Sequence, residues 1–282
     1  MRSFFPSFLC AIWIGCFLSS VSFAEDILAD DQKPDFTQVY HVFDKDDVDM
    51  IATVTYLYED HPKLSVKSVY PQLESDIEND NITQFNSLVK EVVDNEIDDF
   101  KNRIEQYGET PKKSAKKLRK NTLTIDFSAS GLTSNNNQIL SIRLTIQGYI
   151  AGIAHPYHKY AVINYNLSTN QKIELTDLFN SDTEYLSLLS QYIQEQRHNH
   201  FSSQLMQREI EDYKNWNLKP NGLFITLDED QASSHLDGTQ NILIPYSHLK
   251  PIISSHSLLA KCLKRKNCVQ KNLLTGGFID EL

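Results

Sequence analysis

The sequence has 282 residues, of which 40% are hydrophobic and 23% are charged, and its 27 basic residues against 37 acidic ones give a formal net charge of -10. This hydrophobic content excludes a fully disordered chain, and the length suits one large domain or two small ones that share an interface. The negative charge excludes an electrostatic footprint for nucleic acid and favours basic partners.

The first 24 residues have the features of a secretory signal peptide. An apolar run spans residues 4–18, and residues 22–24 form a small-x-small cleavage site. We predict cleavage after Ala24, a periplasmic or secreted location, and no stable membrane span in the cleaved chain. Cleavage removes one arginine and leaves 26 basic and 37 acidic residues, a net charge of -11. Lipidation at Cys16 is disfavoured because Trp13 stands where a lipoprotein signal needs a small aliphatic residue.

Residues 25–120 are expected to form a small strand-strand-helix unit with a basic connector. Residues 51–58 are rich in β-branched and aromatic side chains, and residues 64–70 alternate between apolar and polar. Apolar side chains then recur at helical spacing from Ile82 to Tyr107. The basic run at residues 110–120 has two interpretations: contact with an anionic surface, or a solvated connector, which we favour.

Residues 121–250 are expected to form the main domain, followed by a tail at residues 251–282. Alternating apolar and polar side chains predict an antiparallel meander in which one sheet face is buried. The expected strands are residues 123–127, 139–150, 157–167 and 173–175. Helices are expected at residues 185–193 and 202–213, and further strands at residues 223–227 and 241–244. The predicted fold class is therefore α+β, an antiparallel meander sheet packed against helices and preceded by the smaller unit.

The turn between the second and third meander strands is the predicted binding site. It presents Tyr149, His155, Tyr157 and His158 as aromatic and polar groups at a loop. The H-x-x-H spacing of the two histidines lacks the further ligands that a zinc site needs, so we expect no metal and no cofactor.

Two other features bear on chemistry. Cys262 and Cys268 remain after cleavage, and in an oxidising compartment we predict a disulfide between them. The acidic loop of Asp228, Glu229 and Asp230 could supply an acid and a base to a glycan hydrolase, although a solvated loop is favoured. Nucleophile-elbow, phosphate-loop and dinucleotide motifs are absent from the sequence.

Several segments together resemble one known family. They are residues 139–142, 152–155, 164–167 and 173–179, followed by residues 223–227 and 241–245. Over residues 123–249 the chain resembles the RsiV-like extracellular domain, domain of unknown function 3298. Tyr70-Pro71 before a long helix looks like its companion, domain 4163. Pro156 and Asn170 depart from the family pattern, which often has glycine at both positions.

The resemblance implies an α+β envelope module of the kind found on anti-sigma factors that sense lysozyme and beside peptidoglycan deacetylase domains. With the acidic charge, it leads us to expect an exported binding module that recognises peptidoglycan or a basic lysozyme-like protein. The alternatives are a cell-wall glycan hydrolase that uses Asp228 and Asp230, and a structural envelope protein without a small ligand.

Overall fold

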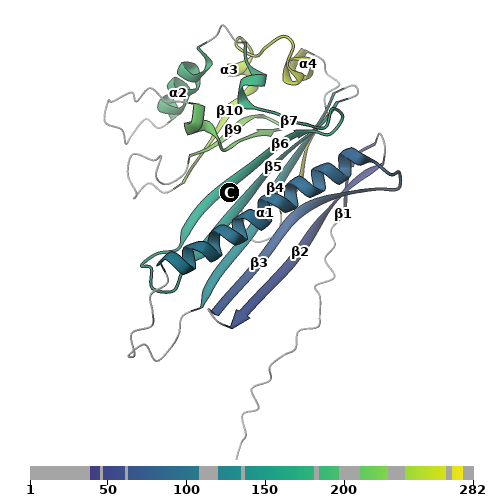
Figure 1. The fold of residues 1–282 in the computed structure, drawn as a ribbon. Coiled ribbons are helices and arrows are strands. Elements are labelled where there is room, and N and C mark those ends of the chain that lie inside the picture. Colours follow the sequence, from purple (N-terminus) through teal and green to yellow (C-terminus); the bar gives the residue numbers. More distant parts are fainter. Residues whose placement is uncertain are drawn as a thin grey trace, which may run out of the picture. The chain divides into compact units, whose positions relative to one another are not determined.

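The computed structural model describes residues 39–44, 47–60, 63–107, 120–134, 137–180, 184–196, 210–227, 239–264 and 269–275. These residues all belong to one compact unit, Thr37–Leu282 (Figure 1). The predicted signal peptide, most of the basic run, and Asp228, Glu229 and Asp230 lie outside the described residues. So does Cys268, and for Cys262 only the backbone is described.

The described elements are runs of strands separated by helices. In chain order they are β1 (Val39–Phe43), β2 (Val48–Asp60), β3 (Lys63–Ser75), α1 (Asp80–Tyr107), β4 (Asn121–Ser134), β5 (Asn137–Tyr149), β6 (Tyr157–Asn166), β7 (Gln171–Lys172), the 3-10 helix η1 (Leu175–Leu178), α2 (Tyr185–Gln196), the 3-10 helix η2 (Ile210–Tyr213), β8 (Trp216–Lys219), β9 (Gly222–Leu227), β10 (Gln240–Pro245), α3 (Tyr246–Leu249), α4 (Leu258–Lys264) and β11 (Val269–Thr275).

Eight of these strands form one sheet in the order β1 to β7, with β11 paired to β4. Neighbours are antiparallel except β3 and β4, which run parallel where Leu64 to Ser68 face Asn121 to Ile125. β11 pairs with the other half of the same edge of β4, from Ser128 to Thr133. The α+β class is thus confirmed, and the strand-strand-helix segment is continuous with the meander rather than set apart from it.

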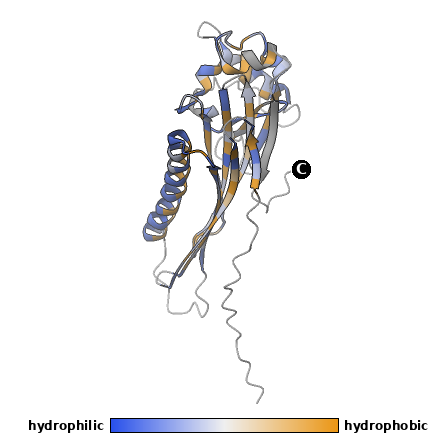
Figure 2. Cartoon of the chain, turned by 90° about the vertical axis from the view of Figure 1, so that its right-hand side faces the viewer, coloured by the Kyte–Doolittle hydropathy of each residue, from blue (hydrophilic) through white to orange (hydrophobic). Residues whose placement is uncertain are grey.

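Helix α1 is the crossover that a parallel strand pair requires. It runs along one face of the large sheet, and its apolar stripe points toward that face (Figure 2). Phe85, Val89 and Phe100 on this stripe are completely buried. They form a first hydrophobic core with the even-numbered residues of β5, from Leu140 to Ile146. Figure 1 shows α1 lying across β3 to β6.

A second, three-stranded antiparallel sheet in the order β10-β9-β8 packs against the opposite face of β5 and β6. Asn217 Nδ2 on β8 donates a hydrogen bond to Ser141 Oγ at 3.0 Å, and the Leu218 amide donates to the same oxygen at 2.9 Å. Arg143 Nη1 on β5 donates to Thr226 Oγ1 on β9 at 3.2 Å. Trp216 lies in the second core that this sheet encloses.

This contact corrects the expectation that the polar side chains of β5 face solvent. Ser141 is 3% exposed and Arg143 is 1% exposed. The alternation of β5 indicated a strand correctly, but over this part both faces are covered, one by α1 and the other by the small sheet. Burial of the guanidinium lowers the pKa of Arg143.

Other differences from the expected elements are local. β1, β8 and β11 were not predicted. In place of the expected strand at residues 173–175, the structure has the two-residue strand β7 just before it and η1 from Leu175 on, with Glu174 and Asp177 in a reciprocal capping box. Of the expected helix at residues 202–213, only the last residues are described, as η2. No helix in the described part of the chain is long and apolar enough to cross a membrane.

Candidate functional site

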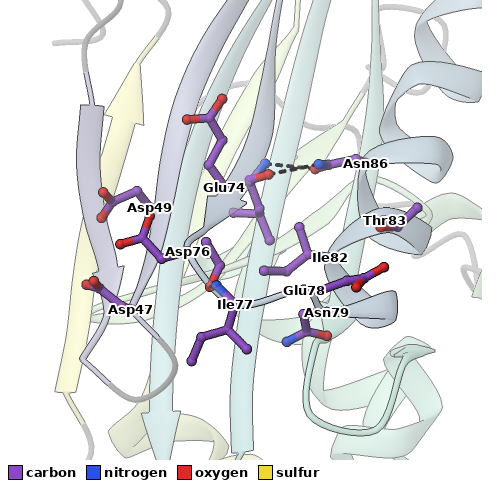
Figure 3. A pocket seen from close by; sticks show the side chains of 12 residues that line it. Asp47, Asp49, Glu74, Asp76, Ile77, Glu78, Asn79, Ile82, Thr83 and Asn86 are labelled. Atoms are coloured by element: carbon purple, nitrogen blue, oxygen red, sulfur yellow. Dashed lines mark hydrogen bonds between the residues drawn. The ribbon is translucent and has the colours of Figure 1, made fainter.

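A cleft of about 500 Å³ opens where the β1–β2 turn, the end of β3 and the start of α1 meet (Figure 3). The strand register creates this meeting point, since Asp49 on β2 pairs with Glu74 on β3. Five carboxylates line the cleft: Asp47, Asp49, Glu74, Asp76 and Glu78. Among the described residues, its lining contains neither lysine nor arginine. The concentration of like charge gives the cleft a negative potential that favours cations.

Two asparagines hold the walls of the cleft in place. The side chain of Asn86 on α1 bonds both backbone groups of Leu73 on β3, accepting from the amide at 2.7 Å and donating to the carbonyl at 2.8 Å (Figure 3). Asn79 Oδ1 accepts from the amide of Asn81 at 3.0 Å, at the start of the helix. The first turn of α1 is therefore fixed to the end of β3, and the carboxylates between them are positioned by a rigid frame.

The cleft also has an apolar component. Ile82 and Leu73 are buried at its base, while Ile77 is 61% exposed at its rim. Lysine and arginine side chains combine an apolar stem with a cationic end, so the lining is complementary to both parts of such side chains. The described residues contain no group of three or more histidine, cysteine or carboxylate side chains arranged to hold a metal ion.

His41 adjoins this cleft from β1. Its Nδ1 atom lies 2.9 Å from Asp49 Oδ1, and its Nε2 atom lies 3.1 Å from Asp44 Oδ1. The hydrogen bond to Asp49 is the main cause of a raised pKa for His41, and the bond to Asp44 adds to it against an opposing contribution from desolvation. As the pH rises, His41 at this edge of the cleft therefore loses its positive charge at a higher pH than an ordinary histidine does.

The structure separates the residues predicted as a binding turn. His155 is exposed in the turn itself. Tyr157 and His158 are consecutive on β6 and so point to opposite faces of the sheet. Tyr149 pairs with Thr122 on β4, and His158 pairs with Gln147 on β5. Because Gln147 and Tyr149 are two residues apart on β5, Tyr149 and His158 share one face of the sheet, the face opposite α1. The turn therefore contributes two residues to one face rather than four to one site.

Tyr157 packs beneath α1. Its ring lies over Gly148 and 6.4 Å from the Phe100 ring, with the Arg103 guanidinium 5.0 Å from its centre. Burial is the main cause that raises the pKa of Tyr157 to about 12. This environment makes Tyr157 a packing residue that holds α1 on the sheet.

The acidic cleft was not identified from the sequence, although a signal for it exists. Acidic residues gather at positions 44–49 and again at 74–80. These runs flank the predicted hairpin at similar distances from its turn, so antiparallel pairing must bring them together. The sequence does not predict the third wall of the cleft, because the position of that wall depends on the direction in which the chain runs from the end of β3 into α1.

Comparison with known proteins gives a match within the second half of the chain. Residues 176–247 match the family model described as "Protein of unknown function (DUF3298)". The similarity to this family is limited to that segment. The segment begins in η1 and ends in α3, so it includes the whole small sheet. It is shorter than the expected stretch of residues 123–249, and the companion domain 4163 remains a prediction.

One solved structure of a DUF3298 protein has a similar fold. A family member from Bacteroides fragilis is 16% identical, with a TM-score of 0.52 over 77% of this chain and 97% of that one. A family protein from Pseudomonas aeruginosa is 14% identical, with a TM-score of 0.38 over 73% of this chain and 94% of that one. No curated protein matches the sequence. The first likeness supports the fold alone.

Proposed function

We propose that this protein is an exported cell-envelope binding module whose acidic cleft receives a basic protein ligand of the lysozyme class. The observation that carries the proposal is the cleft whose described lining has five carboxylates and no lysine or arginine. The net charge of -10 and the resemblance to lysozyme-sensing envelope modules support it. The predicted signal peptide supplies the proposed periplasmic or secreted location.

The cleft suits a few basic side chains from a folded partner better than a small metabolite. Its carboxylates come from two separate chain segments, residues 47–49 and 74–78, so they can approach an inserted side chain from more than one side. The aliphatic stem of a lysine or arginine would cover Ile77, which is exposed without such a partner. The net negative charge would also accelerate encounter with a basic protein, an effect that weakens as salt screens it.

A titration with hen lysozyme tests the proposal, with succinylated lysozyme as a probe of the same fold and reversed charge. We expect saturable binding of lysozyme and none of the succinylated form. The double variant Asp76→Asn, Glu78→Gln should weaken binding at least about tenfold, because two carboxylates of the cleft lose their charge. Glu105→Gln, Glu195→Gln is the matched control, with the same change in net charge on α1 and α2.

The two double variants separate a specific cleft from general attraction. If both weaken lysozyme equally, the net charge rather than the cleft is responsible and the proposal fails. If neither changes the affinity, lysozyme binds elsewhere. For the hydrolase alternative, Asp228 and Asp230 lie outside the described residues, so no geometry in the described part of the chain supports it.

A further inference from the structure

A second cavity, of about 260 Å³, lies where the large sheet, the small sheet and the segment before α4 meet. Its walls come from the ends of β5 and β6, from β7, η1 and β8, and from residues 256–259. Among the described residues, it shares no lining residue with the acidic cleft. Cavities that hold drug-sized ligands measure about 300 to 1,000 Å³, so this one suits a smaller group, such as one residue of a peptide.

The floor of this cavity is aliphatic. Four of its side chains come from β5, η1, β8 and α4 and are at most 4% exposed: Ile139, Leu178, Leu218 and Leu259. The half-buried side chains of Ile173 and Leu258 complete the floor. We call the cavity above these six residues the aliphatic pocket. Its described lining contains no phenylalanine, tyrosine or tryptophan, so it offers a flat aromatic ligand no ring for stacking.

The aliphatic pocket contains a buried hydrogen-bond donor that the protein does not use. Asn166, at the end of β6, is 5% exposed, and its Oδ1 atom accepts from the Ser168 amide at 3.1 Å. Its Nδ2 group donates no hydrogen bond within the described part of the chain. The strand registers place Asn166 in one row with Ile139 and Gln171, on the sheet face that forms the floor. A ligand carbonyl in the pocket would satisfy this donor.

The charge at the mouth of the pocket is negative. Asp177 is exposed there, and its Oδ2 atom accepts from the Glu174 amide at 2.8 Å, which leaves the other oxygen for a ligand. Lys172 also lines the pocket, but it pairs with Tyr165, whose ring packs on α1, so the lysine side chain points to the other sheet face. His256 on the rim adds an exposed imidazole rather than a fixed charge.

Hydrogen bonds hold the walls of the aliphatic pocket in place. The Ser254 amide donates to the Leu178 carbonyl at 2.9 Å, which ties η1 to the segment before α4. Ser257 is 7% exposed, and its hydroxyl donates to the Ser254 carbonyl at 2.9 Å and accepts from the Ala260 amide at 3.1 Å. The pocket is therefore formed before a ligand arrives, which lowers the entropic cost of binding.

We infer that the aliphatic pocket binds the first residue of a peptide, an aliphatic residue with a free amino group. The side chain packs on the floor, the carbonyl accepts from Asn166 Nδ2, and the ammonium pairs with Asp177. Gln171 and Thr169, whose side chains make no hydrogen bond within the described residues, lie on the rim for the next peptide group. An aliphatic acid fits less well, because Asp177 would repel its carboxylate.

Four small molecules test the three contacts separately when titrated into the protein and followed by NMR. Leucyl-glycyl-glycine can make all three contacts and should bind most tightly. Triglycine lacks the aliphatic side chain and should bind at least about tenfold more weakly. Isopentylamine keeps that chain and the ammonium without a carbonyl, and should bind at least about fivefold more weakly. N-acetylation of the leucyl peptide removes the ammonium and should cost about threefold to fivefold, because solvent screens the mouth.

Two variants act on the pocket, each with a matched control elsewhere. Asp177→Asn keeps an oxygen for the Glu174 amide, so it should reduce the affinity for the leucyl peptide to that of the acetylated form and leave the acetylated form unchanged. Leu258→Phe fills the pocket and should abolish binding of the leucyl peptide, with urea denaturation as the check that it folds. Asp98→Asn on α1 and Leu188→Phe, at a position 44% exposed on α2, should change neither affinity.

The inference is overturned if leucyl-glycyl-glycine does not bind, or if triglycine or isopentylamine binds as tightly. It is also overturned if Asp177→Asn leaves the affinity unchanged, or if the control variants weaken binding as much as the pocket variants. The inference does not rest on the acidic cleft. Lysozyme binding by Asp177→Asn should remain that of the unaltered protein, and Asp76→Asn, Glu78→Gln should bind the leucyl peptide normally, so the two proposals can fail separately.

Discussion

Gly148 and Tyr157 are cross-strand partners whose packing leaves no space for a side chain at position 148. A Cβ atom there would lie 2.3 Å from Tyr157 Cζ, far inside a normal contact. The ring cannot move away freely, because Phe100 and Arg103 pack on it from α1. We therefore expect Gly148→Ala to destabilise the protein by about 2 kcal/mol, measured by urea denaturation.

Tyr157→Phe is the control for this prediction. The Tyr157 hydroxyl is buried and makes no hydrogen bond within the described part of the chain. Removing it keeps the ring on Gly148, so the free energy of unfolding should stay the same or rise by up to about 1 kcal/mol. Equal destabilisation by the two variants would show that the hydroxyl, rather than the fit of the ring, holds this position.

His41 gives the acidic cleft a dependence on pH. Its pKa is raised above the ordinary 6.5, chiefly by the hydrogen bond to Asp49. Below this raised pKa the imidazolium offsets the charge of Asp49 and Asp44, so the affinity for lysozyme should fall as the pH drops through the raised pKa, which lies above 6.5. His41→Gln should flatten this part of the pH profile. A profile that keeps its shape in the variant would assign the titration to another group.

The same shift has the opposite consequence for stability. A histidine with a raised folded-state pKa stabilises the folded state fully below its unfolded pKa, and this contribution is lost as the pH rises through the folded value. Protonation of His41 thus favours the β1–β2 pairing while it disfavours a basic ligand. A comparison of unfolding and binding over the same pH range would separate the two effects.

At the scale of elements, Ser141 connects β5 to its neighbour β6 and to the small sheet. Its hydroxyl donates to Asn164 Oδ1 at 2.6 Å and accepts from Asn217 and the Leu218 amide. Ser141→Ala would leave these buried groups short of partners, so we expect a loss of about 2 to 3 kcal/mol in a chemical denaturation experiment.

Ser128 is a matched control for Ser141. It lies on β4 on the same sheet face, is 7% exposed, and its hydroxyl makes no hydrogen bond within the described residues. Ser128→Ala should therefore change the free energy of unfolding by less than about 1 kcal/mol. If the two alanine variants are equally stable, the Ser141 hydrogen bonds do not hold the two sheets together.

The elements differ in how far the sequence alone predicts them. The long helix α1 and the strands of the meander could be predicted, because the spacing of their apolar residues reflects the packing of helix and sheet on each other. β8 could not, since Asn217 is polar yet buried, and its burial depends on a partner, Ser141, that is 76 residues away. Asn170 stands where the family often has glycine, and its φ of 58° is a conformation that asparagine tolerates.

The residues considered for binding also differ in how far the sequence predicts their position. Tyr149 and His158 could be singled out as exposed groups near a turn, but Tyr56 and Tyr58, which lie far away in the sequence, join them only through the parallel pairing of β3 and β4. Tyr157 looked equivalent to its neighbours in the sequence. Its role in packing became apparent only with the position of α1, which periodicity does not provide.

At the scale of the whole unit, the β2–β3 hairpin is long enough to carry two separate surfaces. Asp49 lies at the acidic cleft, and Tyr58 lies nine residues along the same strand, about 30 Å away. A protein bound in the cleft would therefore leave the exposed rings of Tyr56 and Tyr58 uncovered.

The two hydrophobic cores should unfold together, because β4 and β5 contribute to both. Ile142 belongs to the first core and Ile139, on the same strand, to the second. Val89→Ala on α1 removes buried methyl groups from the first core alone and should cost about 2 kcal/mol. Trp216 reports on the second core, and in a chain cleaved after Ala24 it is the only tryptophan of the sequence.

We expect Trp216 fluorescence and far-ultraviolet circular dichroism to give the same urea midpoint, and Val89→Ala to lower both midpoints equally. Ile193→Val, which trims the second core from α2, provides the reciprocal test and should also shift both signals by the same amount. Equal shifts of the two midpoints in both variants would mean that the continuous strands transmit the loss of packing from one core to the other. A Trp216 transition that stays in place while the dichroism shifts in Val89→Ala would instead show that the small sheet and its helices unfold independently of α1.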